Sequence, residues 1–294
     1  MAYKQILYEN DNGVAVITLN KPEHLNAVGG QMKGEILEAL NEASADPEVW
    51  GLILTGAGRA FSSGLFQPIG GKKDADYEPA LSEDGRPQEY FYKLPGDEER
   101  ALLGLSSGSP HLVERLLHFD KPTIAAVNGI AAGNAVTYLC ACDIRIASDL
   151  ARLRLAFTRS GMPAPWSSCS YLLTKIVGVG HALELAYTND VIDAREMERI
   201  GLVNRVVPHN ELVPYCKEMI KRMRQTGPSI LFSTKRAIRM CGDVTPNDVE
   251  RGVMYENWAA NVTLEEERAE ARESLKERRQ PVYKGRGIKT NIRW

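Results

Sequence analysis

Short apolar runs and helical patterns alternate along the first part of the chain. Residues 5–9 and 14–19 predict two strands, joined at Asp11-Asn-Gly13 by residues that favour a hairpin turn. Apolar residues three and four positions apart predict a helix over residues 31–45, and residues 50–55 predict a further strand. A strand–strand–helix order that is followed by more strands and helices indicates a layered α/β fold.

The stretch from Pro122 to Ser148 predicts strand, turn, helix and strand in succession. Ile124 to Val127 is a short apolar run that suits a strand buried on both faces. Asn128-Gly129 favours a turn, and small residues follow from Ala131 to Ala135. Such residues can begin a helix whose first N–H groups suit an anion or a polarised carbonyl oxygen. Tight packing of a helix on a strand explains the same residues, so this stretch alone leaves both interpretations open.

We divide the chain into an α/β core over residues 1–208 and a C-terminal helical region with a tail over residues 209–294. Within the core, residues 67–108 are irregular, with repeated glycine and proline and several aromatic side chains. Loops of this length are usually functional or disordered. We interpret this one as a functional insertion, with a solvated surface insertion as the alternative. The remaining predicted elements are a helix at 111–118, a strand at 151–157, helices at 168–176, 182–188 and 194–200, a strand at 203–207, and helices at 211–224, 229–240, 247–261 and 264–279.

The charge balance argues against some classes of partner. The chain has 36 lysine and arginine residues against 38 aspartate and glutamate residues, which gives no basis for binding nucleic acid or an acidic membrane. The first residues lack the apolar run of a signal peptide, and no segment approaches a transmembrane span. Five cysteines, an odd number, indicate reduced thiols in a cytoplasmic enzyme. Cys140-x-Cys142 has no second pair of ligands at metal spacing, so no metal site is expected.

A second loop changes the interpretation of the small residues. Gly51 to Gly56 predicts a buried strand, and a glycine-punctuated loop from Gly58 to Phe66 follows it. Two backbone N–H donors from two separate loops are what a site needs to hold a developing oxyanion. With both stretches, the chain resembles the crotonase (enoyl-CoA hydratase/isomerase) superfamily over nearly its whole length. The motifs that carry the resemblance are Ile17-Thr-Leu-Asn-Lys-Pro22 with Leu25-Asn-Ala27, Leu54-Thr-Gly-Ala-Gly-Arg-Ala-Phe-Ser62 with Gly64, Lys121 to Ser148, Gly201-Leu-Val-Asn-Arg-Val-Val-Pro208, and Pro281-Val-Tyr-Lys-Gly-Arg286.

The resemblance implies a fold, an assembly and a substrate. Members of the family form a spiral of ββα units with a C-terminal helical region, and they assemble into trimers that often pair as hexamers. They act on thioesters of coenzyme A, which serves as the carrier of the substrate. For this chain the resemblance implies an acyl-CoA substrate, no permanently bound cofactor, and a homotrimer or hexamer. It also implies that the insertion at residues 67–108 lies beside the substrate pocket, as a lid or an extra wall.

The resemblance also implies site residues. Two backbone N–H groups polarise the thioester carbonyl in this family, and they fall at Leu65 and Asn134 of this chain. Most members carry glycine in place of Asn134, but asparagine still supplies the N–H and tolerates unusual backbone angles. The matches around coenzyme A are Leu25, Ala27, Ser63, Leu65 and Lys284. Packing or surface solvation explains each of them equally well, except Leu65.

The acid–base residues of the family are missing from this chain. Hydratases of the family use two glutamates, and ungapped alignment from Asn128-Gly129 places Thr137 and Phe157 at their positions. Neither side chain does general acid–base work at neutral pH. His111 is the candidate replacement because an imidazole titrates near working pH, and Glu114 lies one turn later on a similar face. A capped and solvated histidine at a helix start is the alternative.

We therefore expect an acyl-CoA-processing lyase or isomerase that stabilises a thioester enolate or oxyanion without the usual two glutamates. Hydration with another base, C–C cleavage, decarboxylation and thioester hydrolysis stay open. One alternative is a non-catalytic homologue that binds acyl-CoA or only assembles with partner subunits. The other is a CoA-independent hydrolase that cleaves a C–C bond in a small cyclic diketone, and the glycines Gly64 and Gly133 argue against it.

Overall fold

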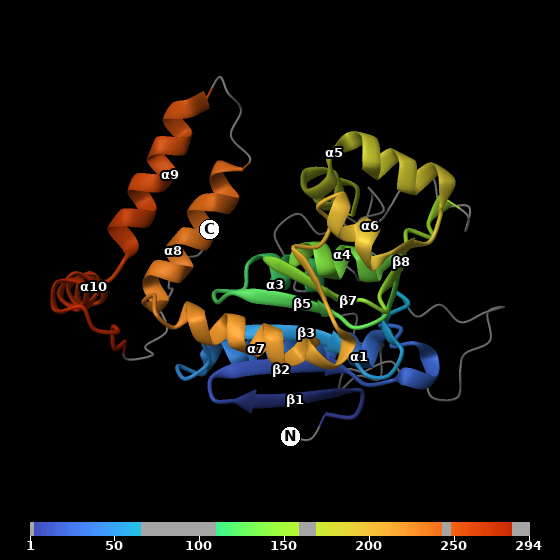
Figure 1. Ribbon diagram of the computed structural model, residues 1–294, viewed down its shortest axis with the longest axis horizontal. Helices are drawn as coiled ribbons and strands as arrows, with labels where there is room; N and C mark the ends of the chain where they lie inside the picture. Colours follow the sequence, from blue (N-terminus) through green and yellow to red (C-terminus); the bar gives the residue numbers. More distant parts are fainter. Residues whose placement is uncertain (1–2, 66–109, 159–168, 243–247, 284–294) are drawn as a thin grey trace, which may run out of the picture.

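The computed structural model describes residues 3–65, 110–158, 169–242 and 248–283 of the chain. The predicted insertion at residues 67–108 and the predicted ligand-binding residue Lys284 therefore lie outside the described residues. Figure 1 shows an α/β body from which the C-terminal helices extend to one side.

The main sheet has six strands, and most of their pairs are parallel. They are β1 (Ile6–Asp11), β2 (Val14–Leu19), β3 (Gly51–Gly56), β5 (Thr123–Val127), β7 (Ile144–Ser148) and β10 (Arg205–Val207). Their order in the sheet is β1-β2-β3-β5-β7-β10. The predicted hairpin is confirmed, since β1 pairs antiparallel with β2 through Asn12 and Gly13, whose φ angles are 52° and 83°. The pairs from β2 onwards are parallel.

A second sheet is built from four short strands. In sheet order they are β4 (Ala60–Ser62), β6 (Ile130–Ala132), β8 (Arg152–Arg154) and β9 (Ile192–Asp193). Along the chain, β3 continues into β4, β5 into β6 and β7 into β8, so each successive pair gives one strand to each sheet. This repetition produces the predicted spiral of ββα units. The sequence analysis predicted a loop where β4 lies and the start of a helix where β6 lies, and both predictions are wrong. Strands of only three residues are too short to show an alternating pattern in the sequence.

Helices follow the strand pairs of the core. α4 is buried along its whole length. α5 is interrupted at Gly178, with φ 78° and ψ 164°, so it corresponds to the two helices predicted over this range. The core helices are α1 (Gly30–Ala45), α3 (Pro110–Leu117), α4 (Asn134–Ala141), α5 (Cys169–Thr188) and α6 (Ala194–Arg199), with short 3₁₀ turns η1 (Pro22–His24) and η4 (His209–Glu211).

Apolar cores lie on both faces of the main sheet. Alternate residues of β3 point to opposite faces, so Leu52 belongs to the core shared with α1, α3 and α4, and Ile53 belongs to the other. α7 (Leu212–Met223) covers the second face with Cys216 and Ile220 (Figure 1). Burial on both faces is the condition that a largely parallel sheet requires.

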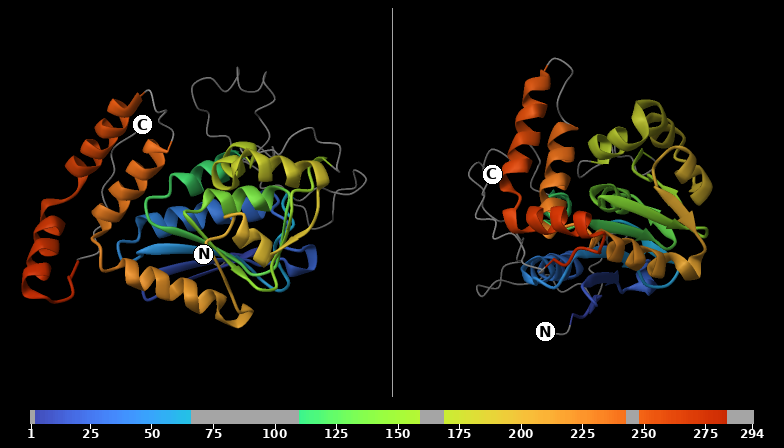
Figure 2. Two further views of the ribbon diagram at one scale, coloured as in Figure 1. Left: turned by 45° about the horizontal axis from the view of Figure 1, so that its top comes forward. Right: turned by 60° about the vertical axis from the view of Figure 1, so that its left-hand side comes forward.

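The C-terminal helices α8 (Pro228–Cys241) and α9 (Val249–Val262) lie side by side, and α10 (Glu265–Glu277) turns back towards the start of α8 (Figure 2). The charge pattern of α10 suits a solvated helix, but Glu267 is an exception because it is only 5% exposed. Its carboxylate accepts hydrogen bonds from the Ser229 N–H (2.9 Å) and hydroxyl (2.8 Å) at the start of α8.

Among the described residues, no helix combines the length and apolarity needed to cross a membrane.

Candidate active site

Two loops of the core are held against each other at the ends of β2 and β4. The Ser63 N–H donates to the Leu25 carbonyl (2.8 Å), and the Val28 N–H donates to the Gly64 carbonyl (2.7 Å). The Ser62 hydroxyl donates to the Asn26 carbonyl (2.7 Å). These bonds bring together the predicted ligand-binding residues of the two loops. Those residues are Leu25, Ala27, Ser63 and Leu65, all partly exposed.

A buried asparagine fixes this pair of loops. Asn26 is fully buried with a left-handed backbone (φ 54°), and its side-chain amide donates to the carbonyls of Ala57 (2.9 Å) and Ala60 (2.8 Å). Its side-chain oxygen accepts the Lys21 N–H (2.9 Å). Sequence analysis missed this role. The Leu25-Asn-Ala27 motif was the available signal, since asparagine tolerates a positive φ and its side chain can satisfy several backbone groups.

The loop after β4 then meets the start of α4. Gly64 has φ 97°, and a Cβ at this position would lie 2.6 Å from the Ala132 carbonyl oxygen and 2.9 Å from the Asn134 nitrogen. Only glycine permits this approach. The structure therefore brings Gly64, the residue before Leu65, against the start of α4 at Asn134.

Asn134 is the first residue of α4 and is 3% exposed. The residue before it, Gly133, has φ 55° and ψ −127°, a backbone conformation that side chains disfavour. The positive end of a helix dipole lies at such an N-terminus, which favours a negative charge or a polarised oxygen there.

Small residues at the turns of the spiral also serve packing. The Asn128 side chain accepts the Gly56 N–H (3.1 Å) and donates to the Gly58 carbonyl (3.0 Å), which joins the turn after β3 to the turn after β5. A Cβ on Gly129 would lie 2.1 Å from the Arg59 carbonyl oxygen. Close packing therefore requires glycine at residues 129 and 64, and the binding of an oxyanion beside Gly64 stays a prediction.

The two residues predicted to occupy the positions of the family's glutamates are buried and carry no carboxylate. Thr137 is completely buried in α4, and Phe157 is 6% exposed. Burial raises the pKa of the neighbouring Cys169 thiol to about 11, and a hydrogen bond with the Thr137 side chain opposes this shift. The Thr137 side chain therefore has a partner in the packing of α4 against α5.

The remaining predicted site residues are not brought to this site by the described contacts. His111 lies in α3, but its side chain lies outside the described residues. Glu114 is exposed on α3, whereas Leu112, Val113 and Leu116 of the same helix are buried. Within the described segments, no group of three or more histidine, cysteine, aspartate or glutamate side chains is placed to hold a metal ion.

The chain is similar to known proteins in both sequence and structure. A protein of Mycobacterium bovis named "Probable enoyl-CoA hydratase echA12" is 37% identical over 225 residues, which cover 76% of this chain and 73% of the relative. The crotonyl-CoA hydratase of Syntrophomonas wolfei is 32% identical over 257 residues, covering 87% of this chain and 88% of that enzyme. The crystal structure of an enoyl-CoA hydratase from Bacillus anthracis superimposes with a TM-score of 0.78 at 27% identity, covering 96% of this chain and all of that one.

The family pattern itself extends over most of the sequence. The pattern described as enoyl-CoA hydratase/isomerase matches residues 9–85 and 99–286. These ranges include both loops of the candidate site and the helices that follow the core. The chain belongs to the enoyl-CoA hydratase/isomerase family and has its crotonase fold.

Proposed function

We propose that the protein binds an acyl-CoA thioester between its two loops and stabilises an enolate or related oxyanion with the backbone N–H groups of Leu65 and Asn134. The observation that carries this proposal is the approach of Gly64 to the Asn134 nitrogen, because it places two loop segments at one point. Donors fixed before the reaction need no reorganisation when charge develops, so they stabilise the transition state more than the substrate. The exposed parts of Leu25, Ala27 and Ser63 supply the adjoining surface for coenzyme A.

The reaction that we propose needs little proton transfer from the protein. Thr137 and Phe157 supply no carboxylate, and both are buried, Phe157 within the apolar core. Loss of carbon dioxide or cleavage of a C–C bond leaves the electron pair on the thioester as an enolate. Two N–H donors stabilise that enolate until its α-carbon takes a proton from water. Decarboxylation therefore needs no general base, whereas C–C cleavage still needs a proton acceptor, such as water, for the hydroxyl or the water that drives it. Hydration would need a base such as His111 to replace the two glutamates.

We propose that the C-terminal helices mediate assembly into a homotrimer or hexamer. Four apolar side chains on α8 and α9 are strongly exposed in the single chain, with Ile238 at 67%, Val249 at 63%, Val253 at 49% and Met254 at 57%. Exposed apolar side chains on helices that project from the body favour contact with another subunit. Sedimentation of the purified protein tests this proposal, and a monomer at micromolar concentration contradicts it.

Mass spectrometry with a pool of acyl-CoA thioesters tests the activity. The pool contains short-chain, branched, malonyl-type and aromatic acyl groups, and every mass is followed with time. We expect loss of carbon dioxide or of an acyl fragment from one class of thioester. A gain of water would instead show hydration and would require His111 or a residue of the insertion as the base.

A non-catalytic acyl-CoA-binding protein is the second candidate. Burial at the two predicted glutamate positions favours this candidate. Thr137 is completely buried, so its side chain is not accessible from solvent. It predicts that some thioester binds while every mass in the pool stays constant. Binding measured by calorimetry together with an unchanged pool would replace the first proposal by this one.

A further inference from the structure

α4 joins the candidate site to a cluster of charged residues at its other end. Its first residue, Asn134, lies at the loop of Gly64, and its last, Ala141, lies seven residues later. At 1.5 Å per residue these two residues are only about 10 Å apart along the helix axis. Because such a short helix moves as one body, whatever holds its C-terminal end also sets the position of its N-terminal end.

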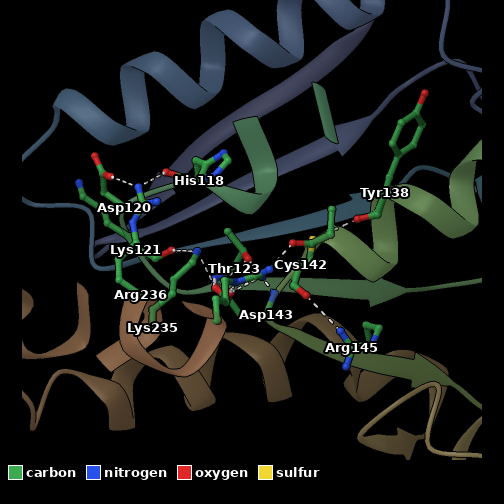
Figure 3. A network of polar contacts seen from close by, with 12 residues as sticks. His118, Asp120, Lys121, Thr123, Tyr138, Cys142, Asp143, Arg145, Lys235 and Arg236 are labelled. Atoms are coloured by element: carbon green, nitrogen blue, oxygen red, sulfur yellow. Dashed lines mark hydrogen bonds and ion pairs between the residues drawn. The ribbon is translucent and has the colours of Figure 1, made fainter. Parts of the chain in front are cut away.

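Asp143 is the centre of the cluster at this C-terminal end (Figure 3). One carboxylate oxygen accepts the Thr123 N–H (2.8 Å) and hydroxyl (2.9 Å) at the start of β5, and it also contacts the Lys235 ammonium (2.8 Å). The other accepts two hydrogen bonds from the Arg239 guanidinium, at 2.7 and 3.2 Å. The carboxylate thus connects the main sheet to two basic residues of α8.

The same basic residues reach the backbone around α4 and β5. Arg239 donates to the Ala141 carbonyl (3.1 Å), which belongs to the last residue of α4. Lys235 donates to the Lys121 carbonyl (3.0 Å), just before β5. A third cation, Arg145, donates to the Cys142 carbonyl (3.0 Å) and is itself fixed by the Leu202 carbonyl (2.7 Å). Cations at the C-terminal end of a helix complement its dipole.

Charge and burial make this cluster rigid. The side chains of Lys235 and Asp143 are 8% and 19% exposed, whereas Arg239 is 31% exposed. Burial opposes ionisation of Asp143, yet the charges of Lys235 and Arg239 hold its pKa below the usual range. Burial lowers the pKa of Lys235, and Asp143 opposes that shift. Charged hydrogen bonds between groups this well shielded from water are strong and directional.

We infer that Asp143, Lys235 and Arg239 are positioning residues that fix α4 and thereby aim the Asn134 N–H at the thioester oxygen. The inference rests on the proposed oxyanion hole. The inference gives α8 a role in the reaction although α8 does not contact the substrate, because α8 acts on the site through α4. A misplacement of about 1 Å can cost about 100-fold in rate, so a small shift of α4 is enough to matter.

Arg239 is the residue to change, because removing Asp143 would leave the buried Lys235 without its counter-charge. Arg239→Met keeps the aliphatic bulk and removes the bonds to Asp143 and Ala141, and Arg239→Lys keeps the charge but loses the fork of donors. The matched control is Arg199→Met in α6, which removes an arginine that makes an equally close two-point pair with Glu196 (2.7 and 2.6 Å) on the surface.

The readout is the infrared stretching band of a ¹³C-labelled thioester carbonyl bound to each protein, with labelled acetyl-, butyryl- and benzoyl-CoA as probes. Hydrogen bonds in an oxyanion hole shift this band to lower wavenumber. We expect the shift in the wild type and in Arg199→Met, a smaller shift in Arg239→Met, and an intermediate one in Arg239→Lys. With a turned-over substrate, kcat of Arg239→Met should fall at least about tenfold while KM changes little.

The outcomes separate the two proposals. A wild type whose bound thioesters show no shift overturns the proposed oxyanion hole and, with it, this inference. A full shift in the wild type and an equal one in folded Arg239→Met overturns the inference alone, because Arg239 then contributes only to stability. If Arg239→Met does not fold, Arg239→Lys decides in the same way, since a folded lysine variant with the full shift and full kcat overturns the inference.

Discussion

Replacing Asn134 by proline removes one backbone N–H from the proposed oxyanion hole and should leave α4 intact. Proline is favoured at the first residue of a helix, where its N–H takes no part in the hydrogen bonds of the helix itself. The residue before a proline is normally restricted by its Cβ. Gly133 has no Cβ, and its φ of 55° and ψ of −127° approximate the mirror image of the polyproline conformation that proline accepts in its neighbour.

The size of the effect follows from the loss of a single donor. Removal of one oxyanion-hole hydrogen bond costs about 2.7–4 kcal/mol of transition-state stabilisation, or about 10² to 10³ in kcat. Asn134→Ala is the matched control, since it removes the side-chain amide but keeps the N–H. We expect kcat/KM of Asn134→Pro to be about 100-fold to 1000-fold below that of Asn134→Ala on the acyl-CoA that the mass-spectrometric screen identifies.

Melting temperatures and circular dichroism of the two variants establish that both are folded. If folded Asn134→Pro turns over the thioester as fast as Asn134→Ala, the N–H of residue 134 does not stabilise the transition state, and the proposed hole is refuted. If alanine alone already causes the full loss, the asparagine side chain and not the backbone carries the effect.

Two further predictions concern the fold around the site, and a third concerns the C-terminal helix α10. Gly64→Ala places a Cβ 2.6 Å from the Ala132 carbonyl oxygen in a backbone with φ 97°. We expect a lower melting temperature, with a cost of about 1–3 kcal/mol from the backbone strain alone, and loss of turnover. An unchanged melting temperature and turnover would contradict the close approach. Thr137→Val should leave kcat within about threefold and lower the free energy of unfolding in denaturant by about 1 kcal/mol, because the Thr137 hydroxyl forms a hydrogen bond with Cys169. A large fall in kcat would show that the hydroxyl serves the reaction. Hydrogen bonds from Arg279 lower the pKa of Glu270 from 4.5 to about 2. The stabilisation from this carboxylate is therefore present above pH 4.5 and disappears as the pH falls towards 2, so the melting temperatures of wild type and Glu270→Gln should converge over that range.

Long periodic elements of the fold were predictable from sequence, and very short ones were not. The hairpin of β1 and β2 and the helix α1 show their period over six to sixteen residues. β6 has only three residues, and it is a strand because Ile130, Ala131 and Ala132 pair with β8. Such pairing depends on chain segments that are distant in sequence, so no local pattern contains it.

The candidate site was predictable where it depends on residue type and family resemblance, and unpredictable where it depends on tertiary contacts. Glycine at residue 64 and small residues before Asn134 indicated a close backbone approach. The same information could not show that Asn26 and Asn128 anchor the loops. A buried asparagine that satisfies several backbone groups and an exposed one in a turn occupy similar local sequences.

Close packing of the core and the proposed oxyanion hole depend on one arrangement of the chain. A spiral of ββα units brings successive turns of the chain into contact, and at Gly56 and Gly129 a Cβ would lie only 2.2 and 2.1 Å from backbone oxygens. One turn further along the chain, the same close stacking places Gly64 against Asn134. The positive end of α4 therefore meets the loop of Leu65 because of how the core packs. The cluster around Asp143 holds the other end of that helix, so stability and the proposed catalysis depend on the same contacts.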